Sequence, residues 1–153
     1  MYSYTLEMNE EKLPILVREK RMIGRNTKHD NPEKIVELFN NNYNLSKKAE
    51  EHCYMISLDS KCHVQGIFEL SHGTVNSSLL SPREILIRGL LTGASNIILI
   101  HNHPSGDPTP SNEDFTTTER IKQAGKMINI PIIDHIIVGD RCFYSFKSEE
   151  KLD

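Results

Sequence analysis

Alternating and continuous runs of apolar residues predict a series of β-strands along the chain. Near the N-terminus, Tyr2, Tyr4 and Leu6 alternate with polar residues, the spacing of a half-buried strand. Residues 96–100 form a short apolar run that is typical of a buried strand. Turn residues separate the remaining runs and indicate two hairpins. Their strands are expected at Cys53–Leu58 with Cys62–Leu70, and at Pro131–Val138 with Cys142–Phe146.

Apolar residues at helical spacing, combined with capping signals, predict three helices. Asn31 precedes Pro32 and so places a capping side chain before a proline at the first helical position. The stretch Ser81–Glu84 has the sequence of a capping box, and Gly93 is expected to end that helix. The expected helices are 32–42, 82–93 and 111–129, the last with Phe115, Ile121, Ala124, Met127 and Ile128 as its apolar positions.

This order of elements predicts an α/β (α+β) fold with a mixed central β-sheet flanked by helices. Residues 1–30 differ from the remainder, because the charged stretch Arg18–Asp30 is expected to be a loop or extended arm. We therefore divide the chain into an N-terminal strand and basic arm, residues 1–30, and a main domain, residues 31–150. A chain of 153 residues can bury a sizeable core without disulfide bonds.

Composition and charge narrow the class of protein. Hydrophobic residues make up 37% and charged residues 25% of the chain, which is typical of soluble globular proteins. No apolar stretch approaches membrane-spanning length. The formal net charge of −3 gives no general attraction to nucleic acid or acidic membranes. The local basic residues are interpreted as a solvated face. They are Arg18, Lys20, Arg21, Arg25 and Lys28.

The cysteines and the N-terminus indicate the compartment. Three scattered cysteines without a C-x-x-C pair argue against a disulfide framework and against a zinc ribbon. They are interpreted as small buried hydrophobic residues. The first residues lack the basic and apolar regions of a signal peptide. These features favour a cytoplasmic protein.

The segment HNHPSGDPTPSNED, residues 101–114, carries the candidate chemistry. His101 and His103 have the i, i+2 spacing that points two side chains to one side of a strand, and Asp114 lies in the first turn of the next helix. Two imidazoles and a carboxylate are suitable ligands for a catalytic zinc ion. Ser111 and Asp114 also have the spacing of a capping box, which requires no metal. Capping leaves the paired histidines unexplained.

Longer stretches of the chain resemble a known family. The string HNHPSGDPTPS followed by Asp114 is similar to the JAMM motif of the MPN+ (JAB) metalloprotease domains, and specifically to their bacterial RadC-type branch. Supporting stretches are GTVNSSLLSPREIL, NIILIHNHPSG and IIDHIIVGD, at residues 73–86, 96–106 and 132–140. The resemblance covers roughly residues 30–147. It implies a JAB/MPN domain with a layered architecture related to that of cytidine deaminases.

The resemblance also assigns roles to individual residues. It implies that one Zn²⁺ ion is bound by His101, His103 and Asp114 with water as the fourth ligand, while Ser111 stabilises the oxyanion. A glutamate at the start of the first core strand would take a proton from the water, and Glu51 matches that position. Two other candidates fit less well: Glu50 would face the opposite way on a strand, and Glu84 belongs to the expected capping box.

The remaining histidines have simpler interpretations. His52 and His135 are expected in or beside strands as hydrogen-bonded structural groups. His29, His63 and His72 are expected at the surface.

The resemblance to this family implies a zinc-dependent metallohydrolase that cleaves an amide or isopeptide bond in an unknown peptide or protein substrate. The main alternative is a RadC-like DNA-repair or DNA-processing accessory protein that binds a partner without peptidase activity. The helix-hairpin-helix region typical of RadC-type proteins has no counterpart in residues 1–30. An inactive metal-binding scaffold is a third hypothesis. A zinc deaminase requires H-x-E and P-C-x-x-C motifs, which the sequence lacks.

Overall fold

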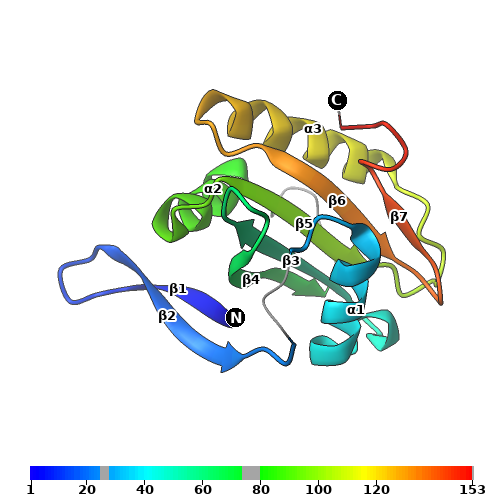
Figure 1. Ribbon diagram of the computed structural model, residues 1–153, viewed down its shortest axis with the longest axis horizontal. Helices are drawn as coiled ribbons and strands as arrows, with labels where there is room; N and C mark the ends of the chain where they lie inside the picture. The colour runs from blue at the N-terminus through cyan, green and yellow to red at the C-terminus, as the bar shows by residue number, and fades with distance from the viewer. Residues whose placement is uncertain (25–27, 74–79, 153) are drawn as a thin grey trace.

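The computed structural model describes residues 1–24, 28–73 and 80–152, in which seven strands form one mixed sheet (Figure 1). The strand order is β2-β1-β4-β3-β5-β6-β7. Strand β5 pairs antiparallel with β3 and parallel with β6. The mixed α/β fold predicted from the sequence is thereby confirmed. The elements are β1 (Tyr2–Met8), β2 (Pro14–Arg21), α1 (Pro32–Tyr43), the 3-10 turn η1 (Leu45–Lys47), β3 (Glu51–Leu58), β4 (Val64–Gly73), α2 (Pro82–Thr92), β5 (Asn96–Asn102), α3 (Asn112–Met127), β6 (Ile132–Val138) and β7 (Phe143–Ser145).

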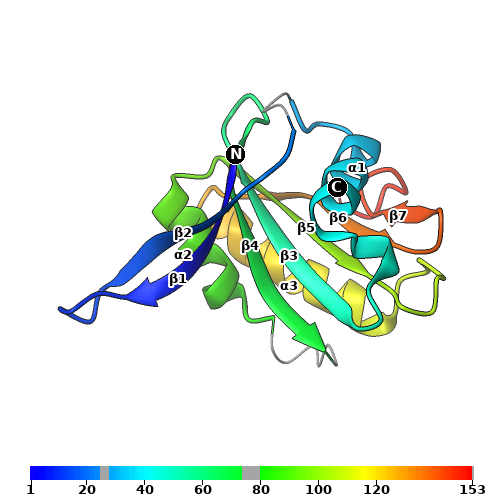
Figure 2. The ribbon, with the colours of Figure 1, turned by 90° about the horizontal axis from the view of Figure 1, so that it is seen from below.

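Helices cover both faces of the sheet, with α1 on one face and α2 and α3 on the other (Figures 1 and 2). The alternation of side chains along β5 supplies both cores. Ile98 and Ile100 pack in the cluster that contains α1, whereas Ile97 and Leu99 pack in the cluster that contains α2 and α3. His101 therefore continues the row of Leu99, on the face that α3 covers. This alternation positions the candidate site.

The N-terminal hairpin extends the sheet at one edge and projects from the body of the molecule (Figure 2). Strand β1 joins β4 through the parallel pair Ser3 and Ile67, and Met22, just after β2, is buried in the core beside α1. The expectation that the chain is a loop or arm from Arg18 onward is wrong for residues 18–21, which belong to β2. They pair with β1 as an edge strand, where charged side chains are common. Arg25 lies outside the described residues.

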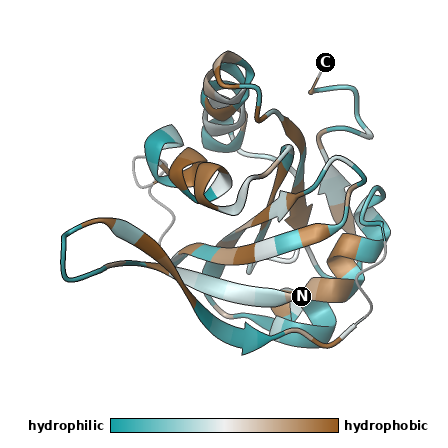
Figure 3. Cartoon of the chain, turned by 60° about the vertical axis from the view of Figure 1, so that its left-hand side comes forward, coloured by the Kyte–Doolittle hydropathy of each residue, from teal (hydrophilic) through white to brown (hydrophobic). Residues whose placement is uncertain are grey.

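Hydropathy follows this arrangement. Figure 3 shows hydrophobic residues along the sheet and on the neighbouring helix surfaces, and a hydrophilic tip on the N-terminal hairpin.

Two basic residues of β2 contact aromatic rings: Arg18 lies 4.1 Å from the ring centre of Tyr2, and Lys20 lies 5.3 Å from that of Tyr43. Within the described residues, no helix is long and apolar enough to cross a membrane.

The helix starts differ in how well the sequence predicted them. At α1 the Asn31 side chain accepts a hydrogen bond from the Lys34 N–H at 2.9 Å, so that cap is confirmed. The capping box predicted at Ser81 is wrong, because the Ser81 side chain makes no capping bond. The Glu84 carboxylate instead pairs with Arg83 at 2.6 Å and lies 3.8 Å from Arg88. Two competing guanidinium groups explain why it does not reach back to the helix start.

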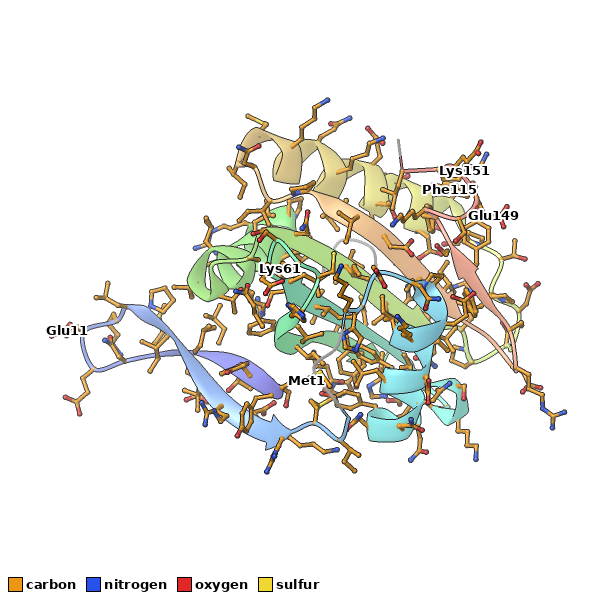
Figure 4. All side chains as sticks on the ribbon, viewed as in Figure 1. Met1, Glu11, Lys61, Phe115, Glu149 and Lys151 are labelled. Atoms are coloured by element: carbon orange, nitrogen blue, oxygen red, sulfur yellow. The ribbon has the colours of Figure 1, made fainter. Side chains whose placement is uncertain are left out.

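Helix α3 buries a different set of residues from the one predicted. Ile121 is buried as expected and Ala124 is partly buried, but Met127 is 87% exposed and Ile128 is 41% exposed. Phe115 is also exposed, and it packs edge-on against Phe146 beside the C-terminal segment (Figure 4). The buried face is completed by small residues, because the helix lies close to the sheet. They are Thr117, Thr118 and Gly125.

Helix α3 also contacts the turn that follows it at Gly125, where an added Cβ would lie 2.4 Å from the carbonyl oxygen of Ile130. Backbone cannot move aside as a flexible side chain can. We therefore expect Gly125→Ala to lower the free energy of unfolding by about 1–3 kcal/mol, measured by urea denaturation. Lys126→Ala, exposed on the same helix, is the control and should change stability by less than about 0.5 kcal/mol. Equal stability of the two variants would contradict the close packing.

Candidate metal centre

Strand β5 and helix α3 bring three donor groups to one point. His101 is the penultimate residue of β5, and His103 follows the strand with its backbone N–H bonded to the Val138 carbonyl at 2.9 Å. Asp114 lies in the first turn of α3. The Nε2 atom of His101 lies 3.1 Å from that of His103 and 3.2 Å from Asp114 Oδ1, and His103 Nε2 lies 3.6 Å from Asp114 Oδ2. These three residues form a group that could hold a metal ion.

The spacing of the donors fits a small divalent cation. In tetrahedral coordination with ligands at about 2.0–2.1 Å, neighbouring donor atoms are separated by roughly 3.3 Å. The two Nε2 atoms lie 3.1 Å apart, and each lies at a similar distance from one of the two Asp114 oxygens, at 3.2 Å from His101 to Oδ1 and 3.6 Å from His103 to Oδ2. All three side chains are also largely buried, with exposed fractions of 5%, 14% and 13% for His101, His103 and Asp114. The donor set and its geometry therefore match a site with three protein ligands.

The loop between the ligands is fixed by its own hydrogen bonds. The Gly106 N–H donates to the His103 carbonyl at 3.0 Å, and the Asp140 N–H donates to the Gly106 carbonyl at 2.9 Å. The Asp107 carbonyl lies 2.8 Å from His103 Nδ1. A carbonyl only accepts, so Nδ1 carries the proton and the neutral ring presents the lone pair of Nε2 toward the site. The loop thus sets both the position and the tautomer of His103.

Asp114 serves the helix cap and the candidate metal site together. The Ser111 N–H and hydroxyl both donate to Asp114 Oδ2, at 2.8 and 2.7 Å, and the Asp114 N–H donates back to Ser111 Oγ at 3.2 Å. The capping box predicted from the sequence is confirmed. Since it fixes the carboxylate while Oδ1 points to His101, capping and metal binding are compatible uses of this residue.

Electrostatics in the group favour a cation between the donors. Burial favours the neutral form of Asp114, but its contacts with the imidazoles of His101 and His103 outweigh burial and hold its pKa well below the usual range. The neighbouring carboxylate of Asp114 raises the pKa of His103. In the absence of metal, a proton on His103 therefore neutralises the carboxylate, and a metal ion would compete with that proton.

A fourth histidine, His135 in β6, packs behind the ligands. Its Nε2 lies 2.9 Å from His101 Nδ1, and its Nδ1 lies 2.6 Å from Thr118 Oγ1. It is 1% exposed, and burial lowers its pKa to about 3. The expectation of a hydrogen-bonded structural histidine is confirmed, although its contact with a candidate ligand was not predicted. His29 corrects another expectation, since it is buried and not at the surface, whereas His63 is half-buried and His72 is exposed.

The low pKa of His135 predicts a specific loss of stability in acid. The unfolded chain binds this proton below pH 6.5 and the folded chain does so only near pH 3, so lowering the pH within that window destabilises the fold. His103 has the opposite sign: its raised pKa contributes fully below pH 6.5, and that contribution is lost as the pH rises. Between pH 6.5 and 4.5, the metal-free protein should lose about 2–3 kcal/mol more unfolding free energy than His135→Gln. Parallel pH profiles in urea denaturation would contradict this assignment.

A cavity of about 430 Å³ opens beside the donor group. Glu51 is half-buried at the start of β3 and lines this cavity together with Cys53, which is two residues further along the same face. Glu50 is exposed and precedes the strand, while Glu84 belongs to α2 and contacts Arg83. The complete lining is Glu51, Cys53, Leu80, His101, His103, Pro104, Ser105, Ser111, Glu113, Asp114, Thr117 and His135.

Asn102 fixes the backbone on both sides of Glu51. Its side-chain oxygen accepts from the His52 N–H at 2.8 Å, and its side-chain nitrogen donates to the Glu50 carbonyl at 3.0 Å. Asn102 is 1% exposed and points to the opposite face from His101. Residues 101–103 therefore have two structural roles: the two histidines face the cavity, and Asn102 holds the start of the neighbouring strand β3.

The cysteines fit the predicted role only in part. Cys53 is buried, but Cys62 is half-buried and Cys142 is exposed. The expectation of three buried cysteines is wrong for the latter two because they lie in turns at strand ends. Burial raises the pKa of Cys53, which lines the cavity, so the neutral thiol predominates near pH 7. Cys53 is not among the three grouped donors, which are the two imidazoles and the carboxylate.

The fold and the site define a class: an α/β domain with a His-His-Asp group, suited to a metal ion, between the end of a central strand and the start of the next helix. Residues 29–152 match the family described as the RadC-like JAB domain. The chain belongs to this RadC-like JAB domain family.

Curated relatives agree with this assignment. A UPF0758 protein of Clostridium acetobutylicum is 48% identical over 100 residues, covering 65% of this chain and 44% of the relative. A UPF0758 protein of Thermotoga maritima is 40% identical over 131 residues, covering 81% of this chain and 59% of the relative. One from Shouchella clausii is 40% identical over 132 residues, covering 83% and 56%. The chain thus spans about half the length of these relatives.

Proposed function

We propose that the domain is a zinc-dependent hydrolase that cleaves an amide or isopeptide bond in a peptide or protein substrate. The observation that carries this proposal is the convergence of two imidazole nitrogens and one carboxylate group, whose ligand atoms lie within 4.8 Å of one another, in a cavity that Glu51 also lines. Three protein ligands of these types are typical of catalytic zinc, which keeps one position for water.

His101, His103 and Asp114 would hold the ion. When bound, zinc lowers the pKa of a water molecule toward neutrality and polarises a carbonyl group. Glu51 has the role of general base: its carboxylate accepts a proton from water and returns the proton to the leaving amine. The Asn102 clamp supports this role, since it limits movement of the backbone that carries Glu51.

Ser111 is proposed to stabilise the oxyanion that develops on the attacked carbonyl. It lines the same cavity, which supports the assignment. Its hydroxyl proton is engaged by Asp114 Oδ2 at 2.7 Å, so the hydroxyl must rotate to reach a substrate oxygen. The capping bond from the Ser111 N–H at 2.8 Å does not involve the hydroxyl and would keep the helix start in place during that rotation.

Hydrolysis can be tested with a defined mixture of internally quenched peptides that contain α-linked and lysine-ε-linked amide bonds. We expect cleavage by the zinc-loaded protein, no cleavage after chelation, and recovery when zinc is added back. A protein that binds zinc but cleaves neither class of bond would contradict the proposed activity. Binding of duplex DNA in a gel-shift assay that weakens with added salt would instead support the DNA-processing alternative.

A further inference from the structure

A chain of hydrogen bonds connects two of the candidate ligands through residues that do not themselves face the metal position. It runs from His101 Nδ1 to His135 Nε2 at 2.9 Å, and from His135 Nδ1 to Thr118 Oγ1 at 2.6 Å. From Thr118 Oγ1 it continues to the Asp114 carbonyl at 2.6 Å. The chain therefore links β5, β6 and α3, and begins and ends on ligand residues.

The protons in this chain can be placed by counting donors and acceptors. The Asp114 carbonyl only accepts, so the single hydroxyl proton of Thr118 is directed to it. Thr118 Oγ1 must then accept from His135, whose proton is consequently on Nδ1. His135 is 1% exposed with no carboxylate beside its ring nitrogens in the described structure, so burial keeps it neutral. Its Nε2 is left as an acceptor.

The same reasoning places the proton of His101. Because His135 Nε2 accepts, His101 Nδ1 must donate and so carries the proton; the lone pair of His101 Nε2 then points toward the candidate metal position between His103 and Asp114. With Thr118 unable to accept, His135 would carry its proton on Nε2 and donate to His101 Nδ1. His101 would then be protonated on Nε2, the atom needed for metal binding.

We propose that Thr118 and His135 are positioning residues that fix His101 in the tautomer able to bind a metal. The inference rests on the metal site of the proposed function and adds the element that prepares it. Thr118 also donates a hydrogen bond to the backbone carbonyl of Asp114. One hydroxyl group therefore positions both His101, through His135, and Asp114 directly. Such hydrogen-bond partners behind a ligand orient it and typically change metal affinity by about 10- to 100-fold.

The packing around His135 supports a fixed orientation. Its ring stacks on Phe146 with ring centres 5.0 Å apart and planes inclined by 13°. Phe146 is itself 1% exposed. A buried ring held between an aromatic face and two hydrogen bonds cannot exchange its two nitrogen positions without breaking both bonds. The tautomer of His101 is therefore set by the fold before any metal arrives.

The test compares three single variants with the wild type. Thr118→Val keeps the shape of the side chain and removes the acceptor, while Thr118→Ser keeps the hydroxyl. Thr116→Val is the matched control, because Thr116 makes the same kind of bond to the carbonyl four residues earlier, at 2.9 Å, on the exposed side of α3. Nitrogen-15 NMR of the metal-free proteins at pH 8 reports which ring nitrogen carries each proton, and competition with a chromophoric chelator gives the affinity for zinc.

We expect His101 to be protonated on Nδ1 in the wild type, in Thr118→Ser and in Thr116→Val, with zinc affinities within about 3-fold of one another. Thr118→Val should move the His101 proton to Nε2 and weaken zinc binding by about 10- to 100-fold. The proposal is overturned by a wild-type His101 protonated on Nε2, a measurement that needs no variant to fold. It is also overturned if Thr118→Val keeps both tautomer and affinity, or if Thr118→Ser loses affinity as Thr118→Val does. The NMR result stands apart from any failure to detect hydrolysis.

Discussion

Glu51→Gln will retain bound zinc and lose peptide cleavage by about 10²–10⁴-fold, the usual contribution of a general base. The amide is nearly the same size as the carboxylate and keeps the contacts of the cavity wall, but it cannot accept a proton from water. Glu51 is not one of the three grouped donors, so the metal content should not change. The measurement pairs zinc analysis with the rate of cleavage of the quenched peptides.

The matched control is Glu50→Gln, which makes the same change one residue earlier on an exposed side chain. Its cleavage rate should stay within about 3-fold of the wild type, since exposed substitutions away from the site have small effects. If Glu50→Gln is the inactive variant and Glu51→Gln is active, the assignment of Glu51 as the base is wrong, and so is the expectation that Glu50 faces away from the site.

The double variant His101→Ala, His103→Ala will lose both the metal and the activity. Only Asp114 would remain of the three donors, and a single carboxylate does not hold zinc at a protein site with useful affinity. Circular dichroism should show that the metal-free variant keeps its secondary structure, because the hydrophobic clusters on both faces of the sheet do not include either histidine.

A second pair of histidines offers the control. His52 and His72 also lie close together, with ring centres 5.6 Å apart and a shared carboxylate partner in Glu69. The variant His52→Ala, His72→Ala should retain zinc and at least half of the wild-type activity. Loss of zinc from His52→Ala, His72→Ala, or retention of zinc by His101→Ala, His103→Ala, would contradict the assignment of His101 and His103 as the histidines that bind the metal.

Much of the fold could be predicted because local patterns and tertiary structure agree. The continuously apolar segment that forms β5 is buried on both faces. Gly93 adopts the left-handed conformation and caps α2, which ends at Thr92. The candidate donor group was predictable for the same reason: the i, i+2 spacing on a strand and the capping box on a helix are both local signals. The structure adds that Asp114 serves both as cap and as candidate ligand.

The features that could not be predicted depend on contacts between distant segments. His135 and Thr118 contact the candidate donor group only because β6 pairs with β5 and α3 packs over both. The clamp formed by Asn102 joins residues about fifty positions apart. Met127 and Ile128 were expected on the apolar face of the helix but are exposed, since an apolar residue near a helix end need not face the core.

The most direct test of the metal centre is X-ray absorption at the zinc edge on the loaded wild-type protein. Two imidazole rings and oxygen ligands should produce a single nitrogen and oxygen shell at about 2.0–2.1 Å with the outer-shell scattering of histidine. The same spectrum from His101→Ala, His103→Ala should show no bound zinc. A sulfur shell at about 2.3 Å would place Cys53 on the metal, and a spectrum without histidine scattering would remove His101 and His103; either result would contradict the site described above.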